Sequence, residues 1–189
     1  MKTLIFNGSP RKSGDTSFLI ETLTAHLRGE TTVIPAYRAS VQPCCDCRYC
    51  WTHAGCCIAD EMQPIYRTIK EADHILIASP IYFSELTGPL LSILSRLQTF
   101  YASKRFLKLA PIEKPKTGGI ILCGGGDGGP QKAESTAHTL LKLMRTTSLA
   151  TVVSLQTDTV PACRDEAAVQ AAVRLAEQLN REGGETISS

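Results

Sequence analysis

Short apolar runs alternate with amphipathic segments along most of the chain. Runs of strand length occupy residues 4–6, 32–34, 74–78, 119–123 and 150–155. Segments with apolar residues at helical spacing follow them, at residues 16–27, 60–72, 89–101, 131–144 and 166–179. Near-continuous apolar strands that alternate with helices are typical of a parallel sheet covered on both faces. We therefore predict an α/β fold built from five βα units.

The length of 189 residues fits one domain with a substantial core. We predict a single domain over residues 1–182, with a cysteine-rich insert at about residues 40–59 and a polar tail at 183–189. The insert falls where a βα unit normally keeps only a short loop.

Charge and hydropathy exclude several classes of partner. The net charge is +2, and the Lys and Arg residues are scattered, so we expect no nucleic-acid partner. No apolar run approaches the roughly 18 residues of a membrane helix, and the first residues do not resemble a secretion signal. We expect a cytoplasmic protein, in which clustered cysteines bind metal, act in catalysis or stay free rather than form disulfides.

Ligands of parallel α/β sheets bind beyond the carboxyl ends of the strands, so the loops there are informative. The loop after the first strand reads "NGSPRKSGDTS" and offers hydroxyl, cationic and backbone donors to an anion at the start of the following helix. The same composition also suits an ordinary capped turn.

Two further loops lie at the same edge of the predicted sheet. The loop "SPIYFSELTGP" carries two aromatic residues, Tyr82 and Phe83, which can stack on a planar ring or pack as core residues under a turn. The loop "CGGGDGGPQ" places five glycines around Asp127, which permits close approach of a ligand to the backbone or merely forms an irregular loop.

Four motifs in this order resemble one known family. They are residues 8–16, the cysteine-rich insert that leads into Asp60-Glu61-Met62, Glu71-Ala72-Asp73, and residues 79–83. The chain resembles the flavodoxin-like NAD(P)H-dependent FMN reductases, including their iron–sulfur flavoprotein branch, over about its first 145 residues. The resemblance implies a three-layer sandwich with a five-stranded parallel sheet in the order 2-1-3-4-5. It also implies FMN as cofactor, NAD(P)H as co-substrate and a homodimer.

The resemblance also implies roles for individual residues. The phosphate of FMN would be held by Ser9, Arg11, Ser13, Thr16 and Ser17, in a loop that also contains Asp15. The isoalloxazine would be lined by Pro80, Ile81, Tyr82 and Phe83, and bordered at its other edge by Gly124, Gly125, Gly126 and Asp127.

Two positions depart from the family pattern. The family commonly has Asn where this chain has Asp15, so we expect that carboxylate to be turned away from the phosphate to cap the helix. A family Asp–Arg pair is Ser95-Arg96 here, which loses a possible ion pair.

The cysteines of the insert allow three interpretations. The spacing Cys44-x2-Cys47-x2-Cys50-x5-Cys56 is close to that of iron–sulfur proteins, and these thiolates could hold a [4Fe-4S] cluster. They could also hold zinc, with His53 able to replace one of them. Many members of the family carry a similar pattern without a cluster, so the resemblance favours free thiols. Cys45 and Cys57 fall outside the spacing.

The leading hypothesis is an FMN-dependent oxidoreductase that takes electrons from NAD(P)H. Its acceptor would be a quinone, a nitro compound, a metal ion or an electron-transfer protein. No catalytic side chain is assigned, because the flavin carries the chemistry and His26, His74 and His138 fall on or beside predicted elements. The alternatives are a non-catalytic electron carrier with the same cofactor and a metal- or redox-sensing module without flavin.

Overall fold

The computed structural model describes residues 1–126 and 128–185, with side chains to Glu182. Its five strands form one parallel sheet in the order β2-β1-β3-β4-β5. Their bounds are β1 (Lys2–Asn7), β2 (Glu30–Pro35), β3 (His74–Pro80), β4 (Lys116–Cys123) and β5 (Thr146–Ser154). The predicted α/β class and sheet order are confirmed.

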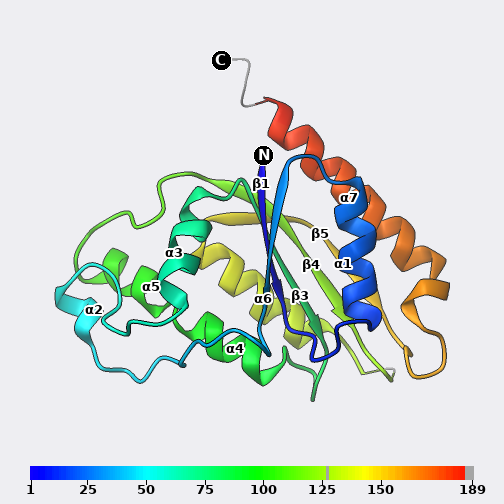
Figure 1. Ribbon diagram of the computed structural model, residues 1–189, viewed down its shortest axis with the longest axis horizontal. Helices are drawn as coiled ribbons and strands as arrows, with labels where there is room; N and C mark the ends of the chain where they lie inside the picture. Colours follow the sequence, from blue (N-terminus) through cyan, green and yellow to red (C-terminus); the bar gives the residue numbers. More distant parts are fainter. Residues whose placement is uncertain (127, 186–189) are drawn as a thin grey trace.

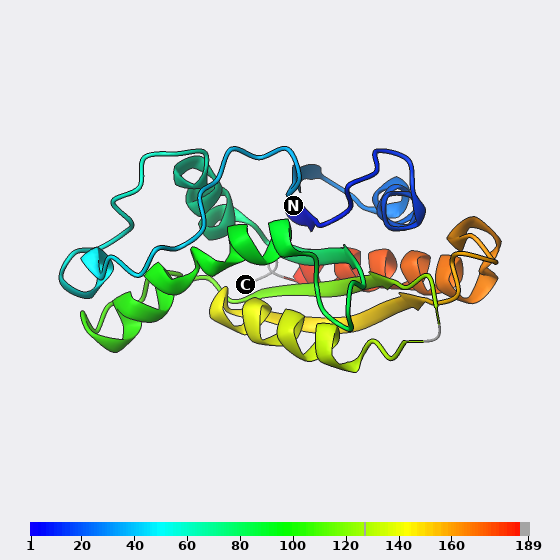
Figure 2. The ribbon, with the colours of Figure 1, turned by 90° about the horizontal axis from the view of Figure 1, so that it is seen from below.

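Helices cover both faces of this sheet (Figures 1 and 2). One face packs against α1 (Asp15–His26), the short 3-10 helix η1 (Ala162–Arg164) and α7 (Glu166–Glu185). The other packs against α3 (Met62–Glu71), α4 (Gly88–Ser95) and α6 (Gln131–Leu143). The chain continues from α4 into α5 (Gln98–Arg105), which contacts the short α2 (Tyr49–Thr52).

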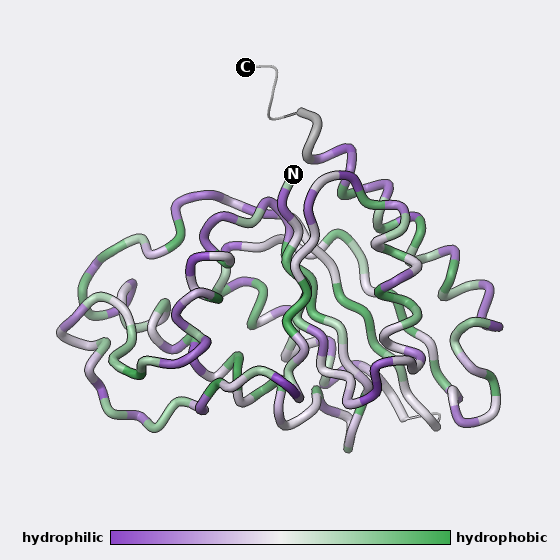
Figure 3. Tube along the Cα trace, in the orientation of Figure 1, coloured by the Kyte–Doolittle hydropathy of each residue, from purple (hydrophilic) through white to green (hydrophobic). Residues whose placement is uncertain are grey.

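Strand residues supply the two hydrophobic cores by alternation, because successive side chains of a strand point to opposite faces. In β1, Leu4 and Phe6 lie in the core under α3 and α4, whereas Ile5 lies in the core under α1 and α7. Apolar segments accordingly run along the central strands in Figure 3. Burial on both faces is why the predicted strands were visible as continuous apolar runs.

Three predicted elements differ most from the observed ones. The fifth strand begins at Thr146 rather than Ala150, because its polar first residues pair with the start of β4 although they carry no apolar signal. The helix predicted over residues 89–101 is two helices, α4 and α5, separated at Arg96 and Leu97. The last helix continues to Glu185, six residues beyond its predicted end at Leu179.

The insert leaves the sheet after β2 and returns at α3. It lies at the end of the molecule opposite α1 and α7, with α2 as its only helix among the described residues (Figure 1). Within residues 1–126 and 128–185, none of the helices combines the length and the apolar character that a membrane span requires.

Candidate functional site

A cleft of about 260 Å³ lies at the carboxyl ends of β1, β3 and β4. Eight of the predicted FMN residues line it: Ser9, Arg11, Asp15, Thr16, Pro80, Ile81, Tyr82 and Gly125. Five further residues complete the lining: Pro10, Gly14, Cys123, Thr157 and Asp158. Five predicted residues lie outside this lining: Ser13, Ser17, Phe83, Gly124 and Gly126. Asp127 lies outside the described residues.

The first loop presents the start of α1 to the cleft. The N-cap residue Gly14 is extended, and no side chain caps the helix, so the N–H groups of its first turn are available to an anion. The hydroxyls of Ser9 and Ser17 instead donate to the carbonyl of Arg11, at 3.2 and 3.0 Å. These two hydroxyls therefore shape the loop, while backbone N–H groups and Arg11 are left to meet a ligand.

The Asp15 carboxylate does not cap its own helix, contrary to the expectation, and Asp15 lies in the lining of the cleft. Its Oδ1 accepts a hydrogen bond of 2.8 Å from the backbone N–H of Ala162, at the start of η1. This bond ties the first loop to the segment after β5 and engages one of the carboxylate's oxygens.

The second loop forms a tight two-residue turn. Tyr82 and Glu85 exchange backbone hydrogen bonds of 2.9 and 3.0 Å, and the residues between them, Phe83 and Ser84, have φ of +52° and +63°. Tyr82 lines the cleft, whereas Phe83 is 101% exposed at the tip of the turn. Phe83 therefore does not line the cleft of its own chain.

The third loop is packed against a segment that the sequence did not single out. The backbone N–H and the hydroxyl of Thr157 donate to the carbonyl of Gly124, at 3.0 and 3.2 Å. A Cβ atom at Gly125 would lie only 2.5 Å from Oδ2 of Asp158, so any larger residue here would displace the Asp158 carboxylate. The signal for Thr157 and Asp158 was available, because they follow the fifth strand at the carboxyl edge of the sheet.

Cys123 ends β4 beneath the cleft and is 3% exposed. Burial raises the pKa of its thiol to about 12, and the neighbouring Thr16 hydroxyl offsets this only in part. The thiol is therefore neutral at physiological pH, and Cys123 packs as a small buried hydrophobic residue.

The cysteines of the insert line a second pocket, which shares no residue with the cleft. Its walls carry all six cysteines of the insert together with Arg96 and Thr99. Within residues 1–126 and 128–185, no group of three or more His, Cys, Asp or Glu side chains is arranged to hold a metal ion. His53 stacks on the ring of Tyr49, with centroids 4.4 Å apart, and contacts the Thr52 hydroxyl.

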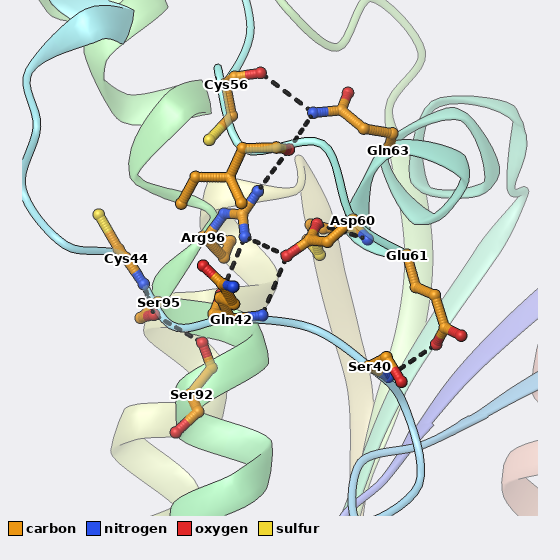
Figure 4. A network of polar contacts seen from close by, with 12 residues as sticks. Ser40, Gln42, Cys44, Cys56, Asp60, Glu61, Gln63, Ser92, Ser95 and Arg96 are labelled. Atoms are coloured by element: carbon orange, nitrogen blue, oxygen red, sulfur yellow. Dashed lines mark hydrogen bonds and ion pairs between the residues drawn. The ribbon is translucent and has the colours of Figure 1, made fainter.

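The expected loss of an ion pair at Arg96 was wrong. The Arg96 side chain is 1% exposed, and its Nη1 lies 2.7 Å from Oδ2 of Asp60 (Figure 4). The same guanidinium donates to the carbonyls of Gln42 and Ile58, at 2.9 and 3.3 Å. Arg96 finds its carboxylate in the insert rather than at its chain neighbour, so it joins both ends of the insert to α4.

Ser95 contributes to the same junction, because its Oγ accepts a 3.0 Å hydrogen bond from the backbone N–H of Cys44. Burial alone would raise the pKa of the Asp60 carboxyl. The hydrogen bonds from Arg96 and from the backbone N–H groups of Gln42 and Met62 outweigh burial, so the pKa is lowered. Ser95 and Arg96 thus position the cysteine pocket.

The histidines lie apart from the cleft. His74 is buried and contacts the Thr117 hydroxyl through Nδ1, at 2.8 Å, and burial lowers its pKa. His26 and His138 lie on the exposed sides of α1 and α6.

Curated proteins resemble this chain in sequence. In comparisons with curated sequences, an iron–sulfur flavoprotein of Methanocaldococcus jannaschii is 31% identical over 135 residues, which is 70% of this chain and 66% of the relative. An iron–sulfur flavoprotein of Archaeoglobus fulgidus is 26% identical over 145 residues, which is 75% of this chain and 63% of the relative. The matches therefore span less than two thirds of these relatives' own length.

Solved structures share the fold. An NAD(P)H:quinone oxidoreductase from Methanothermobacter marburgensis superposes with a TM-score of 0.74 at 18% identity, over 95% of this chain and 96% of that one. An azoreductase from Bacillus anthracis superposes with a TM-score of 0.67 at 13% identity, over 96% and 99% of the two chains. The fold is thus flavodoxin-like. A family model described as NADPH-dependent FMN reductase matches residues 1–159, and the chain belongs to this family.

Proposed function

We propose that this protein is an FMN-dependent oxidoreductase that takes electrons from NAD(P)H. The observation that carries the proposal is the uncapped start of α1, which faces a cleft that also contains an aromatic ring and a closely approached glycine backbone. FMN has a phosphate, a planar ring system and a ring edge rich in hydrogen-bonding groups. The helix start suits the phosphate, the aromatic side chain suits the ring system, and the glycine backbone suits the ring edge.

The lining residues fit FMN by their chemistry. The N–H groups of the first turn of α1 and the Arg11 side chain would hold the phosphate, and Arg11 is the one cationic residue in the lining. Pro80, Ile81 and Tyr82 would cover the ring system. Thr157 and Asp158 add hydrogen-bonding groups at the Gly125 side, where hydroxyl or ring N–H donors could be recognised.

When bound, FMN accepts a hydride and returns electrons singly or in pairs, so the side chains need only bind, orient and exclude water. The neutral thiol of Cys123 beneath the cleft keeps its floor uncharged. The similar structures are named for a quinone and for azo compounds, which supports a planar aromatic acceptor, a quinone or a nitro compound among them. A metal ion or an electron-transfer protein remains an alternative acceptor.

An iron–sulfur cluster on Cys44, Cys47, Cys50 and Cys56 is a second candidate centre, in addition to the flavin. Two observations favour it: the four thiols line one pocket, and the curated relatives are named iron–sulfur flavoproteins. Because the described side chains are not arranged to hold a metal ion, the insert would have to close around a cluster. Iron and zinc determination on anaerobically purified protein decides this point: about four irons per chain support the cluster, zinc without iron supports a zinc site, and neither metal supports free thiols.

The test of the proposed function uses purified protein incubated with FMN and mixed with NADPH or NADH in a stopped-flow instrument. We expect the flavin absorbance to bleach rapidly with at least one nicotinamide. A yellow protein that neither nicotinamide reduces is the electron carrier, and a protein that does not bind FMN is the flavin-free sensing module.

Arg11→Ala checks where the flavin is held. We expect FMN to bind about 10- to 100-fold more weakly, because a charge-assisted hydrogen bond contributes about 1.5–3 kcal/mol. Arg28→Ala, which removes an exposed cation outside the cleft, is the matched control and should leave the affinity unchanged. Equal affinities in the two variants would contradict the assignment. The homodimer is part of the proposal and is measured by sedimentation equilibrium.

A further inference from the structure

Two cysteines of the insert lie in direct contact. The Sγ atoms of Cys47 and Cys57 are 3.6 Å apart, and both residues are exposed. Cys47 belongs to the regularly spaced set of four, whereas Cys57 does not. The contact therefore joins a candidate metal ligand to one of the two cysteines for which the spacing offers no role.

The backbone around Cys57 is fixed by hydrogen bonds, whereas the backbone around Cys47 is irregular and exposed. Cys57 lies between the carbonyls of Cys56 and Ile58, which both accept hydrogen bonds from Nε2 of Gln63, at 3.0 and 2.8 Å. Cys47 lies in an exposed segment without regular secondary structure, between Asp46 and Arg48, whose φ values are +50° and +60°. The anchor of Cys57 fixes one sulfur, and the irregular segment lets the other approach it.

A disulfide needs only a small displacement here. Its S–S bond is about 2.05 Å long, so the sulfurs must approach by about 1.5 Å, which side-chain rotation and a small shift of an exposed loop can supply. The nine residues between the two cysteines include the turn of α2 that brings them back together.

We propose that Cys47 and Cys57 are a reversible thiol–disulfide pair whose oxidant is hydrogen peroxide and whose reductant is a small dithiol, which takes over the disulfide and returns both protein thiols. The thiolate of Cys47 attacks one peroxide oxygen, so that an S–O bond forms, the O–O bond breaks and the first water leaves after protonation. The thiol of Cys57 then displaces the second oxygen as water and forms the S–S bond. Two thiols lose two electrons in total, the peroxide is reduced to two waters, and the balance is the same if Cys57 reacts first.

The pair would control what the cysteine pocket can bind. In the disulfide form Cys47 is removed from the set, and Cys44, Cys50 and Cys56 are one thiolate short of a four-cysteine site for iron–sulfur or zinc. The chemistry does not involve the flavin, so the proposal stands or falls independently of the reductase activity.

The test maps the bond in the full-length protein. Protein purified without oxygen is freed of reductant, treated with one equivalent of hydrogen peroxide and alkylated, and then digested with trypsin. Cys47 and Cys57 fall in different tryptic peptides, residues 39–48 and 49–67. We expect these peptides to be cross-linked, with fragmentation placing the bond between Cys47 and Cys57. Two of the eight thiols should be lost and then recovered with dithiothreitol.

Cys57→Ser should abolish the cross-link, while Cys45→Ser, which removes the other cysteine outside the spacing, should leave it intact. A bond between another pair of cysteines, a cross-link that persists in Cys57→Ser, or no cross-link at all would overturn the proposal. The last outcome includes a protein that keeps bound iron or zinc through the peroxide treatment.

Discussion

Phe83 has a backbone conformation that local stability does not explain. Both central residues of its turn have positive φ, which favours Asn and Gly, yet here they are Phe and Ser. A non-glycine residue in the left-handed region is strained by roughly 1–2 kcal/mol, and the exposed ring recovers none of this by burial. The turn is therefore a place where stability and function can be separated.

We predict that Phe83→Asn and Ser84→Gly each raise the free energy of unfolding by about 0.5–1 kcal/mol, because each relieves strain in the turn. Urea denaturation measures this. If Phe83→Asn alone also lowers the rate of NAD(P)H oxidation, the exposed ring takes part in the reaction, with Ser84→Gly as the control for the backbone. A lower stability in both variants would refute the strain.

Among the elements, the junction of α4 with the insert depends on one ion pair. Arg96 is almost fully buried, and Asp60 has only 10% of its side chain exposed. Loss of one partner of a buried pair leaves the other charge uncompensated, which typically costs about 3–5 kcal/mol. The insert lacks a strand among its described residues, so this pair and the hydrogen bonds around it determine how it lies.

We predict that Arg96→Met lowers the free energy of unfolding by about 3–5 kcal/mol and exposes the insert to limited proteolysis. Arg105→Met, at the exposed end of α5, is the matched control and should change stability by less than about 0.5 kcal/mol. Similar losses in both variants would show that the ion pair is not the anchor.

The ion pair of Asp60 and Arg96 also makes the stability of the protein depend on pH in the acid range. The pKa of Asp60 is lower in the folded protein than in the unfolded chain. The stability that the ionised carboxylate contributes is therefore complete above the unfolded pKa and is lost as the pH falls through the lower folded pKa. Asp60→Asn should therefore lose less stability than the unmodified protein on going from pH 5 to pH 3, measured by urea denaturation.

For the whole molecule, we also predict that stability depends on pH in the alkaline range, because of a buried lysine. Lys116, at the start of β4, is 4% exposed and donates to the carbonyls of Lys70 and Lys114, at 3.1 and 3.3 Å. Burial, reinforced by the charge of Lys114, lowers its pKa from 10.5 to about 8. Between these values the unfolded chain binds more protons than the folded protein, so stability rises with pH.

We predict that the unmodified protein gains stability relative to Lys116→Met between about pH 8 and pH 10.5, by up to about 1.4 kcal/mol per pH unit. Denaturation under reducing conditions at several pH values measures the difference, and Lys108→Met is the exposed control. Parallel curves for all three proteins would contradict the lowered pKa of Lys116.

The sequence by itself determined the fold class, four of the five strands to within a few residues, and three of the loops that form the cleft, but not the loop of Thr157 and Asp158. Burial on both faces makes the central residues of β1 and β3 continuously apolar. The carboxyl ends of parallel strands share one edge, so Arg11 and Tyr82 could be placed together without coordinates. These features depend on local patterns and on topology alone.

Only the tertiary structure decided the contacts between distant segments. Arg96 and Asp60 are 36 residues apart, and Asp158 meets Gly125 across two loops. The polar start of β5 is a strand because β4 lies beside it, and Cys47 meets Cys57 because α2 turns the insert back. Such pairings depend on which surfaces the whole chain brings together, and no local periodicity records them.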